Sequence, residues 1–477
     1  MTAGYGMLKG VEPRIIPRKE HHMSRKQVSP NALTTLYRLH RRGFIAYLVG
    51  GCVRDLLLGR TPKDFDIGTN ATPGQIKRLF RNCRLIGRRF RLAHLHFDDE
   101  IIEVSTFRRT GAASDNPEPE ETDSGHVRRP RHIKDEEGMV LVDNVFGTPE
   151  EDALRRDFTI NALAYNIADA SVIDFSTGLS DLKERLIRPI GDPRVRFTED
   201  PVRMLRAVRF AASHNFDIEA DAWESICELS PTVSRVSPAR IYEEIQKLFL
   251  LGSARPAFSL MEKSGLLAAL FPSLGRWIYG DSSRLAFLEA NLAYLDQRYL
   301  GGTPPSPSLF FAALFGPSLE KAILARHLEG IPRQQALDET CAAFMEEISR
   351  TVSVPGRIGN RLRAILSLQV PLYRMPPRRP ASIAGRQEFG EALMYLRIAA
   401  DTVKEHQAVL EWWDAYILET PPATPSEAST DKVSGRRRRK RKRKSRRAPR
   451  NASRREEGSG SFGPESEEVT KAAPVGS

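Results

Sequence analysis

The sequence contains little cysteine and no long apolar run. Its four cysteines, Cys52, Cys83, Cys227 and Cys341, lie far apart and form no Cys-x-x-Cys pair, so neither a zinc site nor a disulfide framework is predicted. The first residues lack the apolar core of a signal peptide, and no run approaches the roughly 18 apolar residues that span a bilayer. We therefore expect no transmembrane segment and a cytoplasmic location.

Acidic residues are absent from the stretch that carries the excess positive charge. The 477 residues include 72 Lys or Arg and 60 Asp or Glu, which gives a formal net charge of +12. Residues 436–455 contain 14 Lys or Arg and no acid, so the rest of the chain is close to neutral. Such a segment cannot bury itself, and we expect a disordered tail that binds RNA phosphates without sequence preference. The tail begins with Arg436, Arg437, Arg438, Arg439 and Lys440; a role in solubility alone is the alternative.

Length and pattern predict about three domains in the α+β class. Ser29 and Pro30 are an N-cap and a first helical residue, a second helix begins at Pro73, and extended runs over 92–97 and 101–107 form a hairpin. The front third therefore mixes strands with helices.

The rest of the chain has a different pattern. Residues 111–137 are too polar and too rich in Pro and Gly for regular structure to be expected. From about residue 149 to 418 the pattern is helical, with Gly or Pro punctuation. A linker rich in Pro, Ser and Thr then leads into the basic tail.

A glycine pair follows the predicted strand over 46–49. Gly50 and Gly51 allow the backbone to turn sharply and to come close to a ligand. The free amides of the short helix that follows, together with Arg54 in its first turn, attract an anion. An ordinary turn is the alternative for the glycines taken alone.

Two carboxylates follow within the same unit. Asp64 and Asp66 are two residues apart, so a strand over 64–68 would place both side chains on one face. Magnesium in phosphoryl-transfer enzymes is usually held by one or two carboxylates and completed by substrate phosphates. A solvated strand end is the alternative, but glycines and acids in this order favour a nucleotide and metal site.

These residues resemble the signature of the class II nucleotidyltransferase family that contains transfer-RNA CCA-adding enzymes and bacterial poly(A) polymerases, within the DNA polymerase beta superfamily. The resemblance runs from about Ile16 to Phe210 and weakens toward Pro272. It implies ATP as a substrate and two Mg²⁺ ions held by Asp64 and Asp66. Pattern and resemblance together predict five parts: a flexible basic arm (1–28), a polymerase beta-like catalytic head with a mixed sheet (29–180), a helical neck that binds the nucleotide base and RNA (181–272), a helical RNA-binding body (273–420), and a disordered linker and basic tail (421–477). The arm, the linker and the tail follow from pattern and composition alone.

A second motif spans residues 155–162. From the residues alone, Asp157 is an N-cap followed by a helix, with solvated arginines before it. The stretch also resembles the second motif of the same family. That resemblance implies that Arg156 meets the triphosphate, that Asp157 or Asn161 meets the ribose, and that Asp157 belongs to the catalytic set.

A third motif spans residues 199–206. Asp200 before a proline is again an expected N-cap, and Arg203 and Arg206 share a helix face with it. The resemblance implies that Asp200 and Arg203 read the base edge and that Arg206 helps to hold the nucleotide. An enzyme without a template needs such a reader, because a wrong base leaves buried polar groups unpaired.

Three residues of the hairpin have open roles. Glu103 is the available third carboxylate for the metal, although a charged residue on a half-exposed strand is an equal interpretation. His94 and His96 share a strand face. Because no carboxylate or cysteine is expected in register beside them, packing or an RNA-facing role is favoured over metal binding.

The segment Leu85–Phe97 resembles the stretch that separates bacterial poly(A) polymerases from their CCA-adding relatives. It includes three arginines that we expect to bind RNA: Arg88, Arg89 and Arg91. The favoured function is therefore template-independent addition of AMP from ATP to RNA 3′ ends, with pyrophosphate as the second product. A complex that degrades RNA is a partner that the resemblance leaves open.

Three alternatives remain. CCA addition to transfer RNA uses the same chemistry, but the basic tail and the segment 85–97 argue against it. A non-catalytic RNA-binding protein with the same fold is disfavoured by the intact Asp64 and Asp66 pair. A nuclease is disfavoured by the glycine turn, because hydrolysis of RNA requires no triphosphate site.

Overall fold

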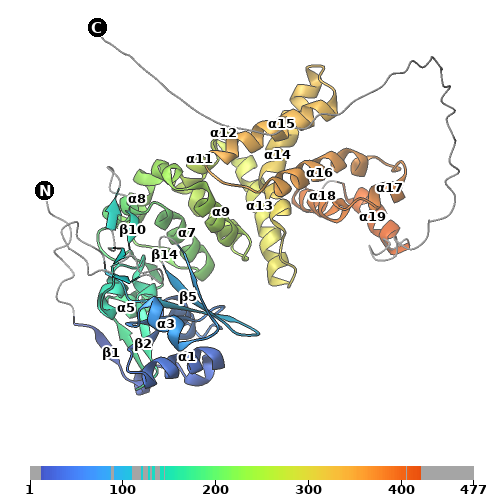
Figure 1. The fold of residues 1–477 in the computed structure, drawn as a ribbon. Helices are drawn as coiled ribbons and strands as arrows, with labels where there is room; N and C mark the ends of the chain where they lie inside the picture. The colour runs from blue at the N-terminus through green and yellow to red at the C-terminus, as the bar shows by residue number, and fades with distance from the viewer. Residues whose placement is uncertain are drawn as a thin grey trace, which may run out of the picture. The chain divides into compact units, whose positions relative to one another are not determined.

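The structure is a computed structural model that describes residues 12–87, 91–109, 145–403 and 406–419, and the backbone of four short strands between 110 and 144. The contacts place these described residues in one compact unit. The predicted α+β class is confirmed, with a mixed sheet in the front part and helices after it (Figure 1). The predicted domain boundaries stay predictions.

An eight-stranded sheet organises the front part of the chain, in the order β1-β12-β11-β2-β3-β6-β5-β4. Strands β3 and β6 pair in parallel, and every other neighbouring pair is antiparallel. The strands are β1 (Arg14–Ile16), β2 (Ala46–Val49), β3 (Asp66–Thr69), β4 (Cys83–Ile86), β5 (Leu92–His96), β6 (Ile101–Thr106), β11 (Leu163–Asn166) and β12 (Ser171–Asp174).

Helices α1 (Pro30–Arg41) and α3 (Pro73–Leu79) begin where their sequences predict. The side chain of Ser29 accepts a hydrogen bond from the backbone of Ala32, and Thr72 and Gln75 form a capping box at the start of α3. Both helices bury their apolar side against the sheet face that carries Ile67. That face is therefore the core side of the sheet.

The opposite face has a smaller apolar cluster. Helix α4 (Pro149–Leu154) contributes Ala153, which packs with Val49 of β2 and Ala164 of β11. Side chains alternate along a strand, so Asp66 and Gly68 also point to this second face, because Ile67 between them points to the core.

The atoms around Gly68 show how tightly this face of the sheet is packed. A Cβ at Gly68 would lie 2.6 Å from the Phe107 ring and 3.2 Å from Val49, whereas a Cβ at Gly74 in α3 would meet no atom within 4 Å. We expect Gly68→Ala to lower the free energy of unfolding by about 1–3 kcal/mol through overpacking. Gly74→Ala should raise it by roughly 0.5–1 kcal/mol, as for alanine in a helix. Urea denaturation of both variants measures the two effects, and equal stability of the pair would contradict the packing.

Three predictions about regular structure need correction. The expected flexible arm is wrong for residues 14–16, which form edge strand β1 against β12. The expected helical stretch from residue 149 contributes strands β11 and β12 to the main sheet. The polar stretch 111–137 contains the short strands β7 (Glu120–Glu121), β8 (Val127–Arg128) and β9 (His132–Lys134), the last of which pairs with β10 (Val140–Asp143).

The helical part follows from Pro193 onward (Figure 1, green to orange). Its helices are α6 (Pro193–Glu199), α7 (Val202–His214), α8 (Ala220–Leu229), α9 (Pro238–Phe249), α10 (Ala254–Lys263), α11 (Leu266–Leu270), α12 (Pro272–Ile278), α13 (Ser282–Leu300), α14 (Pro307–Leu328), α15 (Arg333–Ser349), α16 (Gly356–Tyr373), α17 (Pro380–Ala384), α18 (Phe389–Val403) and α19 (Gln407–Glu419). Between β12 and α6 lies α5 (Gly178–Glu184).

Helix α14 is an exception to the expectation that no segment is long and apolar enough to span a membrane. By those two criteria it qualifies, but 61% of its most apolar window is buried inside the protein. Phe310 of α14 stacks on Phe249 of α9, and Phe315 packs edge-on against Phe271. These contacts are those of a core helix in the helical part.

Candidate active site

Asp66, the first residue of β3, lies where negative charge is concentrated. Burial raises its pKa to about 6, and the charges of Glu103 and Asp64 add to this effect, whereas Arg156 opposes it. The parallel pairing of β3 with β6 sets Glu103 directly beside Asp66 on the same face. A cation bound here would relieve the repulsion.

Asp64 lies outside the strand. Because β3 begins at Asp66, the predicted strand over 64–68 starts two residues later, and Asp64 is exposed in the bend before it. Strand alternation therefore does not place Asp64, although it is near enough to raise the pKa of Asp66. Among the described residues, no three His, Cys, Asp or Glu side chains are arranged as a complete set of metal ligands, so substrate phosphates would have to complete a site here. The metal roles of Asp64, Asp66 and Glu103 stay predictions.

The glycine turn brings the second motif onto the first. Gly50 has φ 77° and ψ −137°, a conformation open to glycine, and it precedes α2 (Gly51–Leu57). A Cβ at Gly50 would lie 2.7 Å from Nη1 of Arg156. The absent side chain therefore leaves room for this guanidinium above the turn.

A chain of hydrogen bonds joins all three motifs. Nη1 of Arg54 donates to Oδ1 of Asn161 at 2.8 Å, and Nδ2 of Asn161 donates to Oδ1 of Asp157 at 3.1 Å. Nε of Arg206 donates to Oδ2 of Asp157 at 2.7 Å. Residues more than a hundred positions apart in the sequence thus form one buried polar network.

Asp157 is at the centre of this network. Burial alone would raise its pKa, but Arg206, Asn161 and the amide of Phe158 hold the pKa of Asp157 well below its usual range. Both oxygens are engaged, which favours a role in positioning Arg206 and Asn161. The N-cap alternative is wrong, because Phe158 is the N-cap of the one-turn helix Thr159–Asn161. The catalytic role stays a prediction.

Asp200 also has a partner in place of a capping role. Nη1 and Nη2 of Arg240, on α9, donate to its two oxygens at 3.1 and 2.9 Å. No side-chain hydrogen bond caps α7, so the N-cap alternative is wrong here too. Nη1 of Arg203 donates to the carbonyl of Arg196 at 2.9 Å and lies 3.4 Å from Glu199. Neighbouring helices therefore fix the side chains of both predicted base readers.

Sequence reasoning missed the residues that hold the motif arginines. Asp152 on α4 is 2% exposed and binds both Arg155 and Arg156, at 2.8 and 3.1 Å. Its position three and four residues before them on a helix was an available signal. Nη2 of Arg196 donates to the carbonyls of Arg155 and Arg156, each at 2.7 Å. No local pattern predicts this long-range contact, or that of Arg240.

The structure corrects one statement about the histidines. The antiparallel pairing of β5 with β6 sets Glu103 opposite His94, and Nε2 of His94 lies 3.4 Å from Oε1 of Glu103. Contrary to the expectation, a carboxylate therefore lies in register beside His94. His96 pairs with Ile101, and its Nε2 is buried without a hydrogen-bond partner among the residues that the structure describes.

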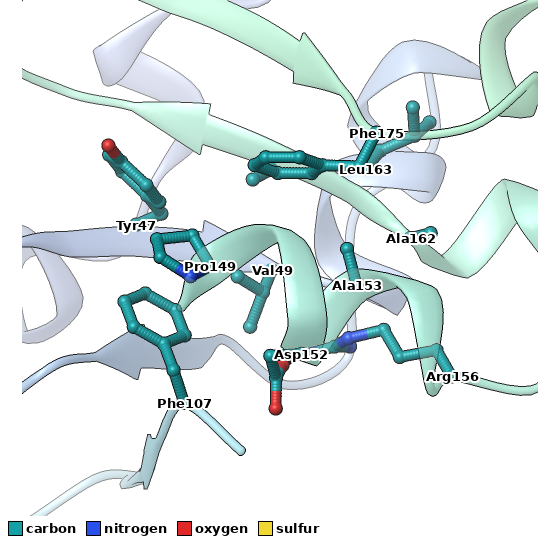
Figure 2. Close-up of a pocket in the computed structure, with 11 residues that line it drawn as sticks. Tyr47, Val49, Phe107, Pro149, Asp152, Ala153, Arg156, Ala162, Leu163 and Phe175 are labelled. Atoms are coloured by element: carbon teal, nitrogen blue, oxygen red, sulfur yellow. Dashed lines mark hydrogen bonds and ion pairs between the residues drawn. The ribbon is translucent and has the colours of Figure 1, made fainter. Parts of the chain in front are cut away.

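A small cavity lies beside Arg156, between α4 and the sheet (Figure 2). Its volume of about 10 Å³ is enough for one water molecule and too small for a nucleotide. Asp152 and Arg156 are its charged members, and the other lining residues are Tyr47, Val49, Phe107, Pro149, Ala153, Ala162, Leu163, Ala164 and Phe175. It is a packing defect next to the site.

The predicted RNA contacts are described only in part. Arg91 is exposed just before β5, and its carbonyl accepts a hydrogen bond from Arg108. Arg88, Arg89 and the tail residues Arg436, Arg437, Arg438, Arg439 and Lys440 lie outside the described residues.

Three family models match the chain. The first, described as the poly A polymerase head domain, matches residues 46–188. The second, a probable RNA and SrmB-binding site of polymerase A, matches 215–278, and the third, the arginine-rich C-terminus of polymerase A, matches 329–448.

Two curated poly(A) polymerases match most of the chain, and a CCA-adding enzyme matches half of it. The chain is 42% identical over 434 residues to "Poly(A) polymerase I" of Salmonella typhimurium, which covers 89% of this chain and 90% of that protein. It is 37% identical over 410 residues to "Poly(A) polymerase I" of Haemophilus influenzae, with 85% and 88% covered. A "CCA-adding enzyme" of Lactobacillus gasseri is 37% identical over 242 residues, or 50% of this chain and 55% of that protein.

Solved structures share the fold. A CCA-adding enzyme of Bacillus stearothermophilus in complex with CTP has a TM-score of 0.55 at 24% identity, covering 82% of this chain and 83% of that chain. A transfer-RNA nucleotidyltransferase solved with a primer transfer RNA and an ATP analogue has a TM-score of 0.56 at 22% identity, covering 81% and 98%.

Proposed function

The chain belongs to the poly(A) polymerase I family, and we propose on this premise that it adds AMP from ATP to RNA 3′ ends without a template. The observation that carries the proposal is the largely buried network that joins Arg54, Asn161, Asp157 and Arg206. Arg156 connects it to Asp66, since Arg156 donates to the carbonyl of Asn161 and its charge acts on Asp66. The network unites three distant motifs near the ends of the central strands β2 and β3, as a nucleotide site requires.

The share of this chain that its relatives match distinguishes adenylate addition from CCA addition. The poly(A) polymerase relatives match 85% to 89% of the chain, including its helical second half, whereas the CCA-adding relative matches 50%. Because CCA-adding structures share the fold over about four fifths of the chain, this contrast lies in sequence and not in fold. The unshared half therefore favours adenylate addition.

The nucleotide residues divide into three groups. Gly50, Gly51 and Arg156 line the triphosphate side, where the turn lets a phosphate approach the backbone. Asp200 and Arg203 read the adenine. Arg54, Asn161, Asp157 and Arg206 hold these parts together, since positioning is most of what phosphoryl transfer asks of a protein.

The carboxylates suit a divalent ion of the Mg²⁺ type. Burial and then repulsion from Glu103 and Asp64 raise the pKa of Asp66, and carboxylate oxygens are the ligands that Mg²⁺ prefers. We propose that Asp64 and Asp66 hold two such ions and that Glu103 is a further ligand. When bound, the ions stabilise charge on the phosphate and on the attacking oxygen.

The transfer itself exchanges one bond for another. The terminal 3′ oxygen of the RNA bonds to the α-phosphorus of ATP while the bond from that phosphorus to the α,β-bridging oxygen breaks. Pyrophosphate leaves with the electron pair, and the hydroxyl proton passes to solvent. The chain's task is to align attacking and leaving oxygens in line.

Partners follow from the same proposal. RNA contacts extend to Arg88, Arg89, Arg91 and the basic tail, whose charge binds phosphates without base specificity. The family model described as a probable RNA and SrmB-binding site supports a protein partner for residues 215–278. A location in the cytoplasm and association with RNA-degrading machinery are parts of the proposal.

The choice of nucleotide and acceptor tests the function. Purified protein is incubated with Mg²⁺ and either ATP or CTP, on an unstructured RNA or on a transfer RNA that lacks its 3′ end. We expect long adenylate tracts on both acceptors with ATP and little extension with CTP, because the base reader discriminates by unpaired polar groups. Addition of only three residues, confined to the transfer RNA, would identify a CCA-adding enzyme instead.

A further inference from the structure

Four polar side chains form a row across four strands. Asp66 of β3 pairs with Glu103 of β6, Glu103 pairs with His94 of β5, and His94 pairs with Arg84 of β4. Directly paired residues point to the same side of a sheet. The row therefore leads from the proposed metal site toward the β4 edge of the sheet.

The face that carries this row is open beyond Asp66. The side chain of Glu103 is 45% exposed and that of His94 is 19% exposed, and Arg84 is also exposed. On the other face, Val104 and Leu95 of the same strands are fully buried. The polar row thus lies on a surface that a ligand can reach.

The strand order assigns a side to each substrate. The glycine turn after β2 and Arg156 above it lie on one side of β3, and β6, β5 and β4 lie on the other. In-line transfer places the leaving pyrophosphate and the attacking hydroxyl at opposite ends of the α-phosphorus. If the triphosphate occupies the β2 side, the RNA 3′ end enters from the β6 side.

We infer that the row Glu103, His94 and Arg84 is the subsite for the RNA 3′ end, and that His94 is a positioning residue that holds Glu103 beside Asp66. This inference rests on the proposed function. His94 lies 3.4 Å from Glu103, which is otherwise half in solvent, so the contact limits how this carboxylate can rotate. Arg84 supplies a positive charge for the phosphates behind the terminal nucleotide.

His96 provides a matched control for His94. It lies on the same strand and face, with its ring centroid 6.4 Å from that of His94, but it pairs with Ile101 instead of a carboxylate. His94→Leu and His96→Leu thus each remove an imidazole ring from the same face of β5, two residues apart. Only His94→Leu loses the contact with Glu103. His94→Gln keeps an N–H that can donate to Glu103.

The test compares the kinetics of the three variants with those of the wild type, with ATP and a short adenylate oligomer varied separately. For His94→Leu we expect kcat/KM for the RNA to fall about 10- to 100-fold, as for other residues that orient an active-site ligand, with KM for ATP unchanged. His94→Gln should recover much of this loss, and His96→Leu should behave like the wild type.

Arg84 gives a readout that needs no catalysis. Fluorescence anisotropy in EDTA measures binding of the same RNA oligomer, and Arg84→Gln should weaken it and reduce the salt dependence by about one unit of slope. An inactive wild type would refute the proposed function itself. With an active wild type, equal losses in His94→Leu and His96→Leu, a raised KM for ATP, or unchanged RNA binding by Arg84→Gln would each overturn the subsite.

Discussion

Replacing Asp66 by asparagine should abolish adenylate addition while leaving the protein folded. A carboxylate that holds the metal contributes several kcal/mol to transition-state stabilisation, so kcat should fall roughly 10³-fold or more. The measurement is incorporation of labelled AMP into an RNA oligomer. Asp98→Asn, in the exposed turn between β5 and β6, is the matched control and should retain activity.

The stability of the Asp66→Asn variant distinguishes a metal ligand from a structural acid. Because the folded-state pKa of Asp66 is raised to about 6, its ionisation at pH 7 opposes folding when no cation is bound. We therefore expect the variant to have an equal or higher free energy of unfolding in EDTA at pH 7. Any gain should shrink as the pH falls through 6, where Asp66 becomes protonated. Retained activity, or a clear loss of stability, would contradict the assignment.

Replacing Arg206 by methionine should destabilise the protein. Asp157 has a side chain that is 10% exposed, and Arg206 is 33% exposed. Removal of the arginine leaves the Asp157 carboxylate unpaired in the interior. Breaking a fully buried ion pair lowers the free energy of unfolding more than breaking a surface pair. After allowance for the partly exposed arginine, we expect a loss of about 2–3 kcal/mol at pH 7 in urea denaturation.

The pH dependence of this loss has a definite sign. The folded-state pKa of Asp157 lies below its ordinary value, so the pair stabilises the protein above that ordinary value, near 4, and the contribution fades as the pH falls further. The difference between wild type and Arg206→Met should therefore shrink in acid.

Two controls accompany the Arg206 variant. The double variant Asp157→Asn with Arg206→Met should recover stability at pH 7, because it removes the carboxylate that the single variant leaves unpaired, while Glu244 keeps Arg209 and Lys247 as partners. Arg350→Met breaks an ion pair whose side chains are 73% and 76% exposed, so it should change stability little. A loss in Arg350→Met equal to that in Arg206→Met would contradict the role of the buried pair.

Local signals predicted the elements whose cause is local. The N-caps at Ser29 and Thr72 fix the starts of α1 and α3, and the glycine turn at Gly50 follows a strand, as expected. The hairpin β5–β6 has the same origin, since acidic turn residues separate two apolar runs. Such features depend on neighbours within a few positions, which the sequence displays directly.

The predictions that failed concern side chains and strands whose partners lie far away in the sequence. Asp157 and Asp200 each have the sequence context of an N-cap, but Arg206 and Arg240 take up their oxygens. The strands β11 and β12 are short and follow a motif. They form because β11 pairs with the edge of β2 and β12 then pairs with β11. The pairing of Asp66 with Glu103 depends on a parallel register that no alternation pattern predicts.

The most direct test of the account is calorimetric titration of ATP into the wild-type protein and the Asp66→Asn variant, each with and without Mg²⁺. We predict that the wild type binds ATP markedly more tightly when Mg²⁺ is present, and that this dependence on Mg²⁺ disappears in Asp66→Asn. Uptake by the wild type that is the same in EDTA, or a variant that keeps the full Mg²⁺ dependence, would contradict a shared site for metal and nucleotide at the start of β3.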